Sequence, residues 1–196
     1  MEFIAHRINT VHQLKAIPRQ YGVELDLRDR GSRLILQHEP FADGEDFEQF
    51  LTHYRHGTMI LNIKSERIEH EVLRLLRKHG IDRYFFLDSS FPMIHLLSKA
   101  GESNIALRFS EYEGLDTVMA MKERVRWVWV DCFQRFPMDR PEYDFLKAAG
   151  FKLCLVSPEL QGREDDIRSY RAYIEENAFV FDAICTKVHN IPRWCD

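Results

Sequence analysis

The segment MILNIKSERIEHEVLRLLRKHGIDRYFFLD (residues 59–88) contains the pattern that decides the fold. It opens with a short apolar run at 59–64 and closes with another at 84–88. Between the two runs, apolar residues recur with the spacing of one helical face, namely Ile68, Val72, Leu75 and Leu76. Gly80 stands where such a helix should end. A strand, an amphipathic helix and a second strand in this order are typical of a βαβ unit with parallel strands.

The same alternation recurs along the whole chain. Eight short apolar runs are rich in β-branched or aromatic residues, as buried strands are: residues 3–6, 23–28, 59–64, 84–88, 105–110, 127–133, 152–157 and 183–188. The stretches between them have helical spacing, and no linker or shift in composition divides the chain. We therefore predict one α/β domain over residues 1–196, a compact (β/α)8 TIM barrel. An open doubly wound sheet is the alternative, but no glycine-rich phosphate loop follows the first run.

The end of the chain predicts an incomplete last sector of this barrel. After the eighth run only HNIPRWCD (residues 189–196) remains, which leaves no room for a final helix. Apolar surface between the last and first strands would then be exposed, and a partner usually covers such a patch. The apolar residues available there are Phe179, Phe181, Ile191 and Trp194. We therefore expect a homodimer.

Composition excludes several classes of protein. Lys and Arg number 27 against 31 Asp and Glu, so the net charge is −4, which argues against nucleic acid or an anionic membrane as the general partner. With 45% hydrophobic residues, the chain is not disordered. No apolar stretch is long enough for a transmembrane segment, and the N-terminus does not read as a secretory signal. The four cysteines form no C-x-x-C pair, and we expect reduced cysteines in a cytoplasmic protein.

Two acidic residues in the second run are the first candidates for chemistry. Glu24 and Asp26 are two positions apart on a strand, so both carboxylates point to the same side. Carboxylates that close repel each other unless a cation or a shared proton relieves them. Mg²⁺ or Ca²⁺ suits two carboxylates together with water and substrate oxygens. Simple ion pairs with Arg7, Arg28 or Arg30 are the equally open alternative.

Four further polar residues lie at or near the predicted carboxyl ends of strands. Asn62 can offer a carbonyl oxygen to the same cation, and Lys64 an ammonium group to an anion. His6 ends the first run and His38 lies in an extended excursion after the second, so two imidazoles are available as general base and general acid. On residue type alone, a solvated lysine and two ordinary histidines account for the same pattern.

The stretches IAHRINT (residues 4–10) and GVELDLRDRGSRLILQHEPF (residues 22–41) together resemble the glycerophosphodiester phosphodiesterase family. That family shares a (β/α)8 barrel with phosphatidylinositol-specific phospholipase C and the spider sphingomyelinases D. Its motif is His-Arg-Gly, then Glu-x-Asp on the next strand, then a turn and hairpin that end in His-Asp. NIK (62–64), SSF (89–91) and FDAICTK (181–187) are similar to later segments of the family, so the resemblance covers almost the whole chain.

The resemblance implies an acid/base pair and a metal site. His6 and His38 would be the catalytic pair, and Glu24 and Asp26 would ligate the metal. Asn62 stands where the family usually has a third carboxylate ligand, which weakens the metal assignment but leaves its oxygen as a candidate ligand. The implied reaction is metal-dependent hydrolysis of a small phosphodiester, similar to a glycerophosphodiester, with Mg²⁺ or Ca²⁺ as the cofactor.

The resemblance also implies that Arg7 and Lys64 hold phosphate oxygens of the substrate. Ile8 replaces the motif glycine and the loop after it is shortened, so the entrance near His6 must have a different shape. Glu39 stands where an aspartate usually follows the second histidine. The family's insertion after the second strand is reduced here to about ten residues. Asn62 and the shortened loops keep a second hypothesis open, a catalytically degenerate barrel that binds a phosphorylated ligand without turnover.

Overall fold

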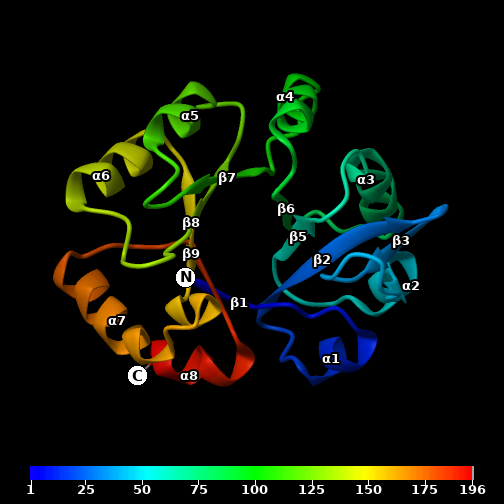
Figure 1. Cartoon of the computed structure of the whole chain (residues 1–196), viewed down its shortest axis with the longest axis horizontal. Helices are drawn as coiled ribbons and strands as arrows, with labels where there is room; N and C mark the ends of the chain where they lie inside the picture. Colours follow the sequence, from blue (N-terminus) through cyan, green and yellow to red (C-terminus); the bar gives the residue numbers. More distant parts are fainter. Residues whose placement is uncertain (196) are drawn as a thin grey trace. The chain divides into compact units, whose positions relative to one another are not determined.

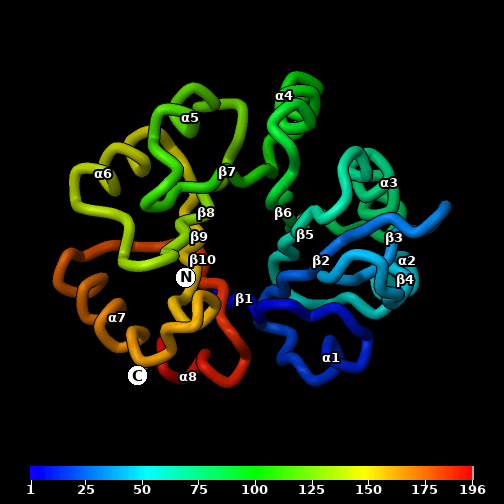
Figure 2. The backbone as a smooth tube through the Cα atoms, viewed as in Figure 1, coloured from blue at the N-terminus to red at the C-terminus, as the bar shows by residue number. Residues whose placement is uncertain are grey.

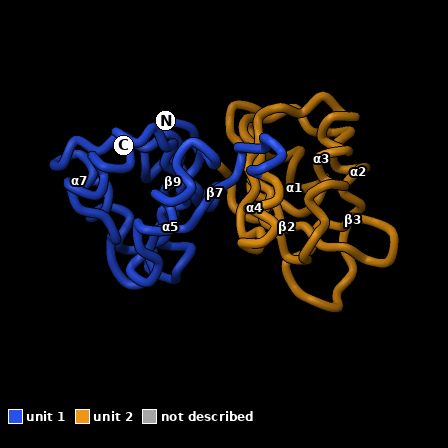
Figure 3. The backbone as a smooth tube through the Cα atoms, turned by 90° about the horizontal axis from the view of Figure 1, so that it is seen from above, with its two compact units in different colours: residues 1–3, 98–196 blue, residues 4–97 orange. Residues whose placement is uncertain are grey.

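The computed structural model describes residues 1–195, which form two compact units. One unit is Ile4–Leu97, and the other comprises Met1–Phe3 and the chain from Ser98 onward (Figure 3). The eight predicted runs all form strands, and helices separate them along the chain. The predicted α/β fold is thus confirmed. Closure into a full barrel and the single-domain assignment stay predictions.

The unit Ile4–Leu97 is built on parallel strands in the order β1 (Glu2–Ala5, of which the last two residues belong to this unit), β2 (Gly22–Arg30), β5 (Met59–Ile63) and β6 (Tyr84–Leu87). The short strands β3 (Arg33–Leu36) and β4 (Glu45–Asp46) extend β2 in antiparallel order. Its helices are α1 (Val11–Ala16), α2 (Phe47–His53), α3 (Glu69–Lys78) and α4 (Phe91–Lys99). All five residues of β5 are buried, as expected of a central strand between two neighbours (Figure 1).

The other unit repeats the pattern with β7 (Ala106–Phe109), β8 (Trp127–Val130), β9 (Lys152–Val156) and β10 (Ala183–Thr186), each parallel to the next. Helices α5 (Leu115–Ala120), α6 (Arg140–Ala148) and α7 (Ile167–Glu176) lie on one side of these strands (Figure 2). Three short 3-10 turns follow the last two strands: η1 (Pro158–Gln161), η2 (Glu164–Asp166) and η3 (Val188–Asn190).

The helix boundaries follow from local chemistry. The side chain of Asp139 caps α6 by accepting a hydrogen bond from the Glu142 N–H at 2.9 Å. In turn, the side chain of Glu142 accepts a hydrogen bond from the Asp139 N–H at 2.8 Å. Pro141 occupies the first turn of the helix, where it needs no hydrogen-bond donor. Gly80 and Gly150, just beyond α3 and α6, have φ of 66° and 87°, a left-handed conformation that glycine adopts without a steric penalty.

The predicted absence of a final helix is wrong. After β10 the chain forms η3 and then α8 (Ile191–Cys195), a helix of five residues. Trp194 is 5% exposed and donates its indole N–H to Ser157 Oγ at 2.9 Å, which ties α8 to the end of β9. All four apolar residues that were expected to be exposed are buried: Phe179, Phe181, Ile191 and Trp194. The reason for expecting a homodimer therefore disappears.

Within residues 1–195, no helix is long and apolar enough to cross a membrane. Cys132, Cys154 and Cys185 are buried as free thiols, and Cys195 is exposed.

Candidate active site

Two buried carboxylates on β2 form the centre of the candidate site. Glu24 and Asp26 are each 1% exposed. They alternate along β2 with the apolar residues Val23, Leu25 and Leu27. Asn62 on β5 pairs in register with Asp26, and its Nδ2 donates to Glu24 Oε1 at 2.9 Å. The strand pairing thus brings the three predicted metal ligands together.

The turn after β1 supplies donors to the same carboxylates. The Arg7 N–H donates to Glu24 Oε2 at 2.7 Å, and the Ile8 N–H donates to the Glu24 carbonyl at 2.8 Å. Arg7 has φ of 58°, a left-handed conformation that is unfavourable for a residue with a side chain, and this hydrogen bond offsets part of the cost. His6 Nε2 lies 3.7 Å from Glu24 Oε2. This turn therefore holds the first predicted catalytic histidine against the buried pair.

Asn9, within the stretch 4–10 that carries the resemblance, is a site residue to which the sequence assigned no role. Its Nδ2 donates to Asp26 Oδ2 at 2.8 Å, and its Oδ1 accepts the Asp26 N–H, also at 2.8 Å. These two hydrogen bonds fix both the backbone and the carboxylate of Asp26. The available signal was an amide side chain three residues after His6 in a short loop, which by itself does not identify a partner.

Two cations and a third carboxylate surround Asp26. Lys64 Nζ lies 3.7 Å from Asp26 Oδ1 and 3.6 Å from Asp88 Oδ2. Arg7 Nε lies 3.7 Å from Asp26 Oδ2, and its side chain is 47% exposed. The ion-pair alternative is therefore met in part by Arg7, although these distances exceed those of hydrogen-bonded pairs. Asp88, at the end of β6 with φ of 60°, was not assigned a role from the sequence.

Arg28 lies two positions beyond Asp26 on β2 and connects two loops of the site. Its guanidinium donates to the His38 carbonyl through Nη2 at 2.7 Å and Nε at 3.2 Å, and to the Lys64 carbonyl through Nη1 at 2.9 Å. Arg28 thus holds backbone rather than neutralising the carboxylates. The His38 imidazole is hydrogen-bonded through Nδ1 to Glu39 Oε1 at 2.5 Å rather than to the carboxylate pair, and this contact lowers the pKa of Glu39.

The pKa of Glu24 differs from that of an ordinary carboxyl group. Burial raises the pKa of Glu24 to about 7, and the nearby charge of Asp26 acts in the same direction. The hydrogen bonds from Asn62 and Arg7 and the charge of Lys64 oppose this rise. A cation beside the pair would favour the ionised form of both carboxylates.

Two buried oxygen atoms make the site suitable for a hard cation. Asp26 Oδ1 and Asn62 Oδ1 are buried and accept no hydrogen bond from the described residues, which is costly for polar atoms. Carboxylate and amide oxygens are ligands that Mg²⁺ and Ca²⁺ accept. Within residues 1–195, no cluster of three or more His, Cys, Asp or Glu could hold a metal ion, so an ion here would take its further ligands from the amide oxygen, water or substrate.

These features define an α/β fold with a polar site at the carboxyl ends of its first parallel strands. No protein-family model matches the chain, and no curated protein does. Among solved structures, a glycerophosphodiester phosphodiesterase from Agrobacterium tumefaciens C58 matches with a TM-score of 0.66 and 16% identity, over 94% of this chain and 96% of that one. A candidate glycerophosphoryl diester phosphodiesterase from the same strain matches with a TM-score of 0.67 and 14% identity, over 95% and 93% of the two chains. The chain therefore shares the fold of these proteins, in agreement with the resemblance of its motifs.

Proposed function

We propose that the chain hydrolyses a small phosphodiester, similar to a glycerophosphodiester, with the help of Mg²⁺ or Ca²⁺. One observation carries the proposal: the buried pair Glu24 and Asp26, with an unsatisfied oxygen on Asp26, lies among His6, Arg7 and Lys64. Acid/base, anionic and cationic groups in one place are what phosphoryl transfer from a diester needs. The fold shared with the two proteins above supports this reading.

In the proposed mechanism, Glu24, Asp26 and Asn62 would hold the divalent ion. When bound, such an ion neutralises charge that develops on the phosphate oxygens. Lys64 and the half-exposed Arg7 bind the remaining anionic oxygens and orient the diester, since both carry positive charge at the edge of the pair.

The two histidines move the protons. One imidazole removes the proton from the attacking hydroxyl group, and the other gives a proton to the departing alkoxide. Glu24, 3.7 Å from His6 Nε2, is close enough to orient the ring or to stabilise its protonated form. His38 lies two residues beyond β3, and its Nδ1 is bound to Glu39, which leaves Nε2 for a proton transfer.

Binding of a phosphorylated ligand without turnover is the alternative. It is favoured by Asn62, whose neutral amide provides less attraction for a cation than a carboxylate would. A metal-dependent assay on an aryl phosphodiester and on glycerophosphodiesters separates the two, because only the enzyme releases the alcohol.

We expect His6→Ala and His38→Ala each to reduce kcat by about 10²- to 10⁴-fold, because general acid and base groups contribute that much. The fold should persist, as circular dichroism would show. His12→Ala is the matched control, since His12 is exposed on α1. If either variant retains the parent kcat on the best substrate, that histidine is not an acid/base group.

A further inference from the structure

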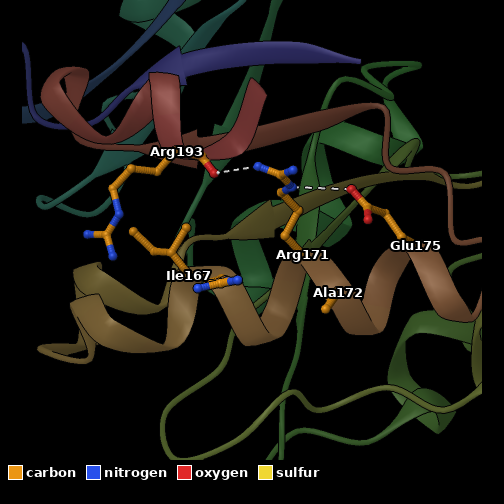
Figure 4. A pocket seen from close by; sticks show the side chains of 6 residues that line it. Ile167, Arg171, Ala172, Glu175 and Arg193 are labelled. Atoms are coloured by element: carbon orange, nitrogen blue, oxygen red, sulfur yellow. Dashed lines mark hydrogen bonds and ion pairs between the residues drawn. The ribbon is translucent and has the colours of Figure 1, made fainter. Parts of the chain in front are cut away.

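A cavity of about 460 Å³ lies beside α7, outside the candidate active site (Figure 4). Five of its lining residues come from α7 and one comes from α8: Ile167, Arg168, Arg171, Ala172, Glu175 and Arg193. The buried Ile167 and the small Ala172 leave room between the longer side chains. All six residues belong to the unit that begins at Ser98.

The charge around this cavity is opposite in sign to that of the whole chain. Three arginines line it against a single glutamate, whereas the net charge of the protein is −4. Glu175 is already engaged, since its Oε1 accepts from Arg171 Nε at 3.2 Å (Figure 4). Guanidinium groups remain protonated at all physiological pH values, so the excess of positive charge is permanent.

The three guanidinium groups also keep hydrogen-bond donors in reserve. Arg171 Nη1 donates to the Arg193 carbonyl at 3.2 Å. This bond holds Arg171 against α8 but uses only some of the N–H donors of its guanidinium group. Arg193 Nη1 donates to Glu164 Oε1 at 3.0 Å and to Asn190 Oδ1 at 3.4 Å, and neither acceptor lines the cavity. The side chain of Arg168 makes no hydrogen bond or ion pair with any other residue of the described chain, and it is exposed. Two arginines are therefore held in place and a third is uncommitted.

We propose that this cavity is an accessory binding site for a phosphate group, either inorganic phosphate or the phosphate of a monoester. A tetrahedral oxyanion has several oxygens in different directions, so it can accept from more than one guanidinium group. A carboxylate has two oxygens in one plane and is satisfied by one arginine. The cavity exceeds the volume of one phosphate group, which leaves space for an organic substituent beside Ile167 and Ala172.

The test is a titration of the full chain carrying Lys64→Met, because this substitution removes a phosphate-binding group of the proposed active site. Inorganic phosphate is added at constant ionic strength while the arginine Nε–Hε resonances are followed by NMR. We expect saturable shifts at Arg168, Arg171 and Arg193, and at least tenfold weaker binding of acetate. Arg168→Gln and Arg193→Gln should each weaken phosphate binding about tenfold, as loss of one charge-assisted contact implies.

Arg77→Gln is the control, since Arg77 is an exposed helical arginine on α3. Shifts that do not saturate, or an equal loss of binding in Arg77→Gln, would overturn the proposal. Unchanged melting temperatures show that the variants remain folded. Tighter binding of glycerol phosphate than of inorganic phosphate identifies a monoester as the ligand, whereas equal binding identifies free phosphate, and either result supports a phosphate site.

Discussion

At the scale of single residues, the candidate site depends on hydrogen bonds that hold two like charges together. Glu24 accepts from Arg7 and Asn62, and Asp26 accepts from Asn9. Each of these donors is an uncharged N–H group, so repulsion between the carboxylates is reduced but not removed. This residual repulsion makes the pair sensitive to protons and to cations.

The raised pKa of Glu24 predicts how stability changes with pH. Its folded-state pKa of about 7 exceeds the ordinary value of 4.5, so the folded state binds the proton more tightly than the unfolded state. The stabilisation is complete below pH 4.5 and is lost as the pH rises through 7. We expect the metal-free protein to lose on the order of 3 kcal/mol of stability from this group between pH 4.5 and 8.

The measurement is thermal unfolding in chelator between pH 5 and 8, for the parent and for Glu24→Gln. The variant carries no titrating group at this position, so its melting temperature should vary less across the range. An equal pH dependence in both proteins would mean that Glu24 titrates normally.

Arg28 is expected to act through the backbone segments that it holds. Arg28→Met removes three hydrogen bonds to the carbonyls of His38 and Lys64, which should loosen both. We predict a loss of about tenfold or more in kcat/KM, corresponding to about 1.4 kcal/mol. Arg28→Lys should recover part of the lost kcat/KM, because the lysine ammonium group can still donate to one of the carbonyls.

Arg30→Met is the matched control for this prediction. Arg30 lies on the same strand and pairs with Asp43 at 3.6 Å, and both side chains are largely exposed. Steady-state kinetics would be compared for all three variants. A loss in Arg30→Met as large as that in Arg28→Met would assign the effect to general weakening of β2.

At the scale of elements, stability depends on how each helix begins. The reciprocal hydrogen bonds between Asp139 and Glu142 satisfy two N–H groups at the start of α6. Asp139→Ala should therefore lower the free energy of unfolding by about 0.5–2 kcal/mol, measured by urea denaturation. Asp165→Ala, at an exposed position in η2, should change it by less than about 0.5 kcal/mol.

Periodicity was sufficient to predict most elements from the sequence. The unit of β5, α3 and β6 follows from residues 59–88, because short apolar runs and a helical face have different periods. The last helix could not be predicted in this way. The five residues of α8 are too few for a periodic pattern, and the contact of Trp194 with Ser157 is a tertiary interaction.

The same distinction applies to the site. Alternation on β2 predicted that Glu24 and Asp26 face one side, and neighbouring strands brought Asn62 beside them. The bonds from Asn9 and Arg28 depend on loop conformation, which residue spacing does not specify. The left-handed backbone of Arg7 was also unpredictable, because nothing in its residue type favours that conformation.

At the scale of the whole molecule, a bound ion should stabilise the native state by mass action. Mg²⁺ or Ca²⁺ at 100 times its dissociation constant would add about 2.7 kcal/mol, provided that the unfolded chain does not bind it. We expect the melting temperature to rise with metal concentration, whether or not the protein is catalytically active.

Variants of Asn62 test this prediction. The formal charges of a divalent ion and the carboxylates of Glu24 and Asp26 sum to zero. In Asn62→Glu a third carboxylate makes this sum −1. The glutamate should reduce the metal concentration needed for half of the thermal shift and raise KM for an anionic diester. Asn62→Leu should increase that concentration, because a ligand oxygen is lost. If both variants respond to metal as the parent does, Asn62 does not bind the ion.

The connection between β3 and β4, residues 37–44, has a consequence for engineering. Arg28 fixes its outgoing limb at His38, and Glu45 fixes its returning limb by accepting the Val11 N–H at 2.7 Å. Between these anchors the chain is mainly exposed, and Phe41 is fully accessible. Doubling the length of such a loop costs only about 0.6 kcal/mol in closure entropy. A covering module can therefore be grafted at this tip to narrow substrate choice while β2 and its carboxylates stay in register.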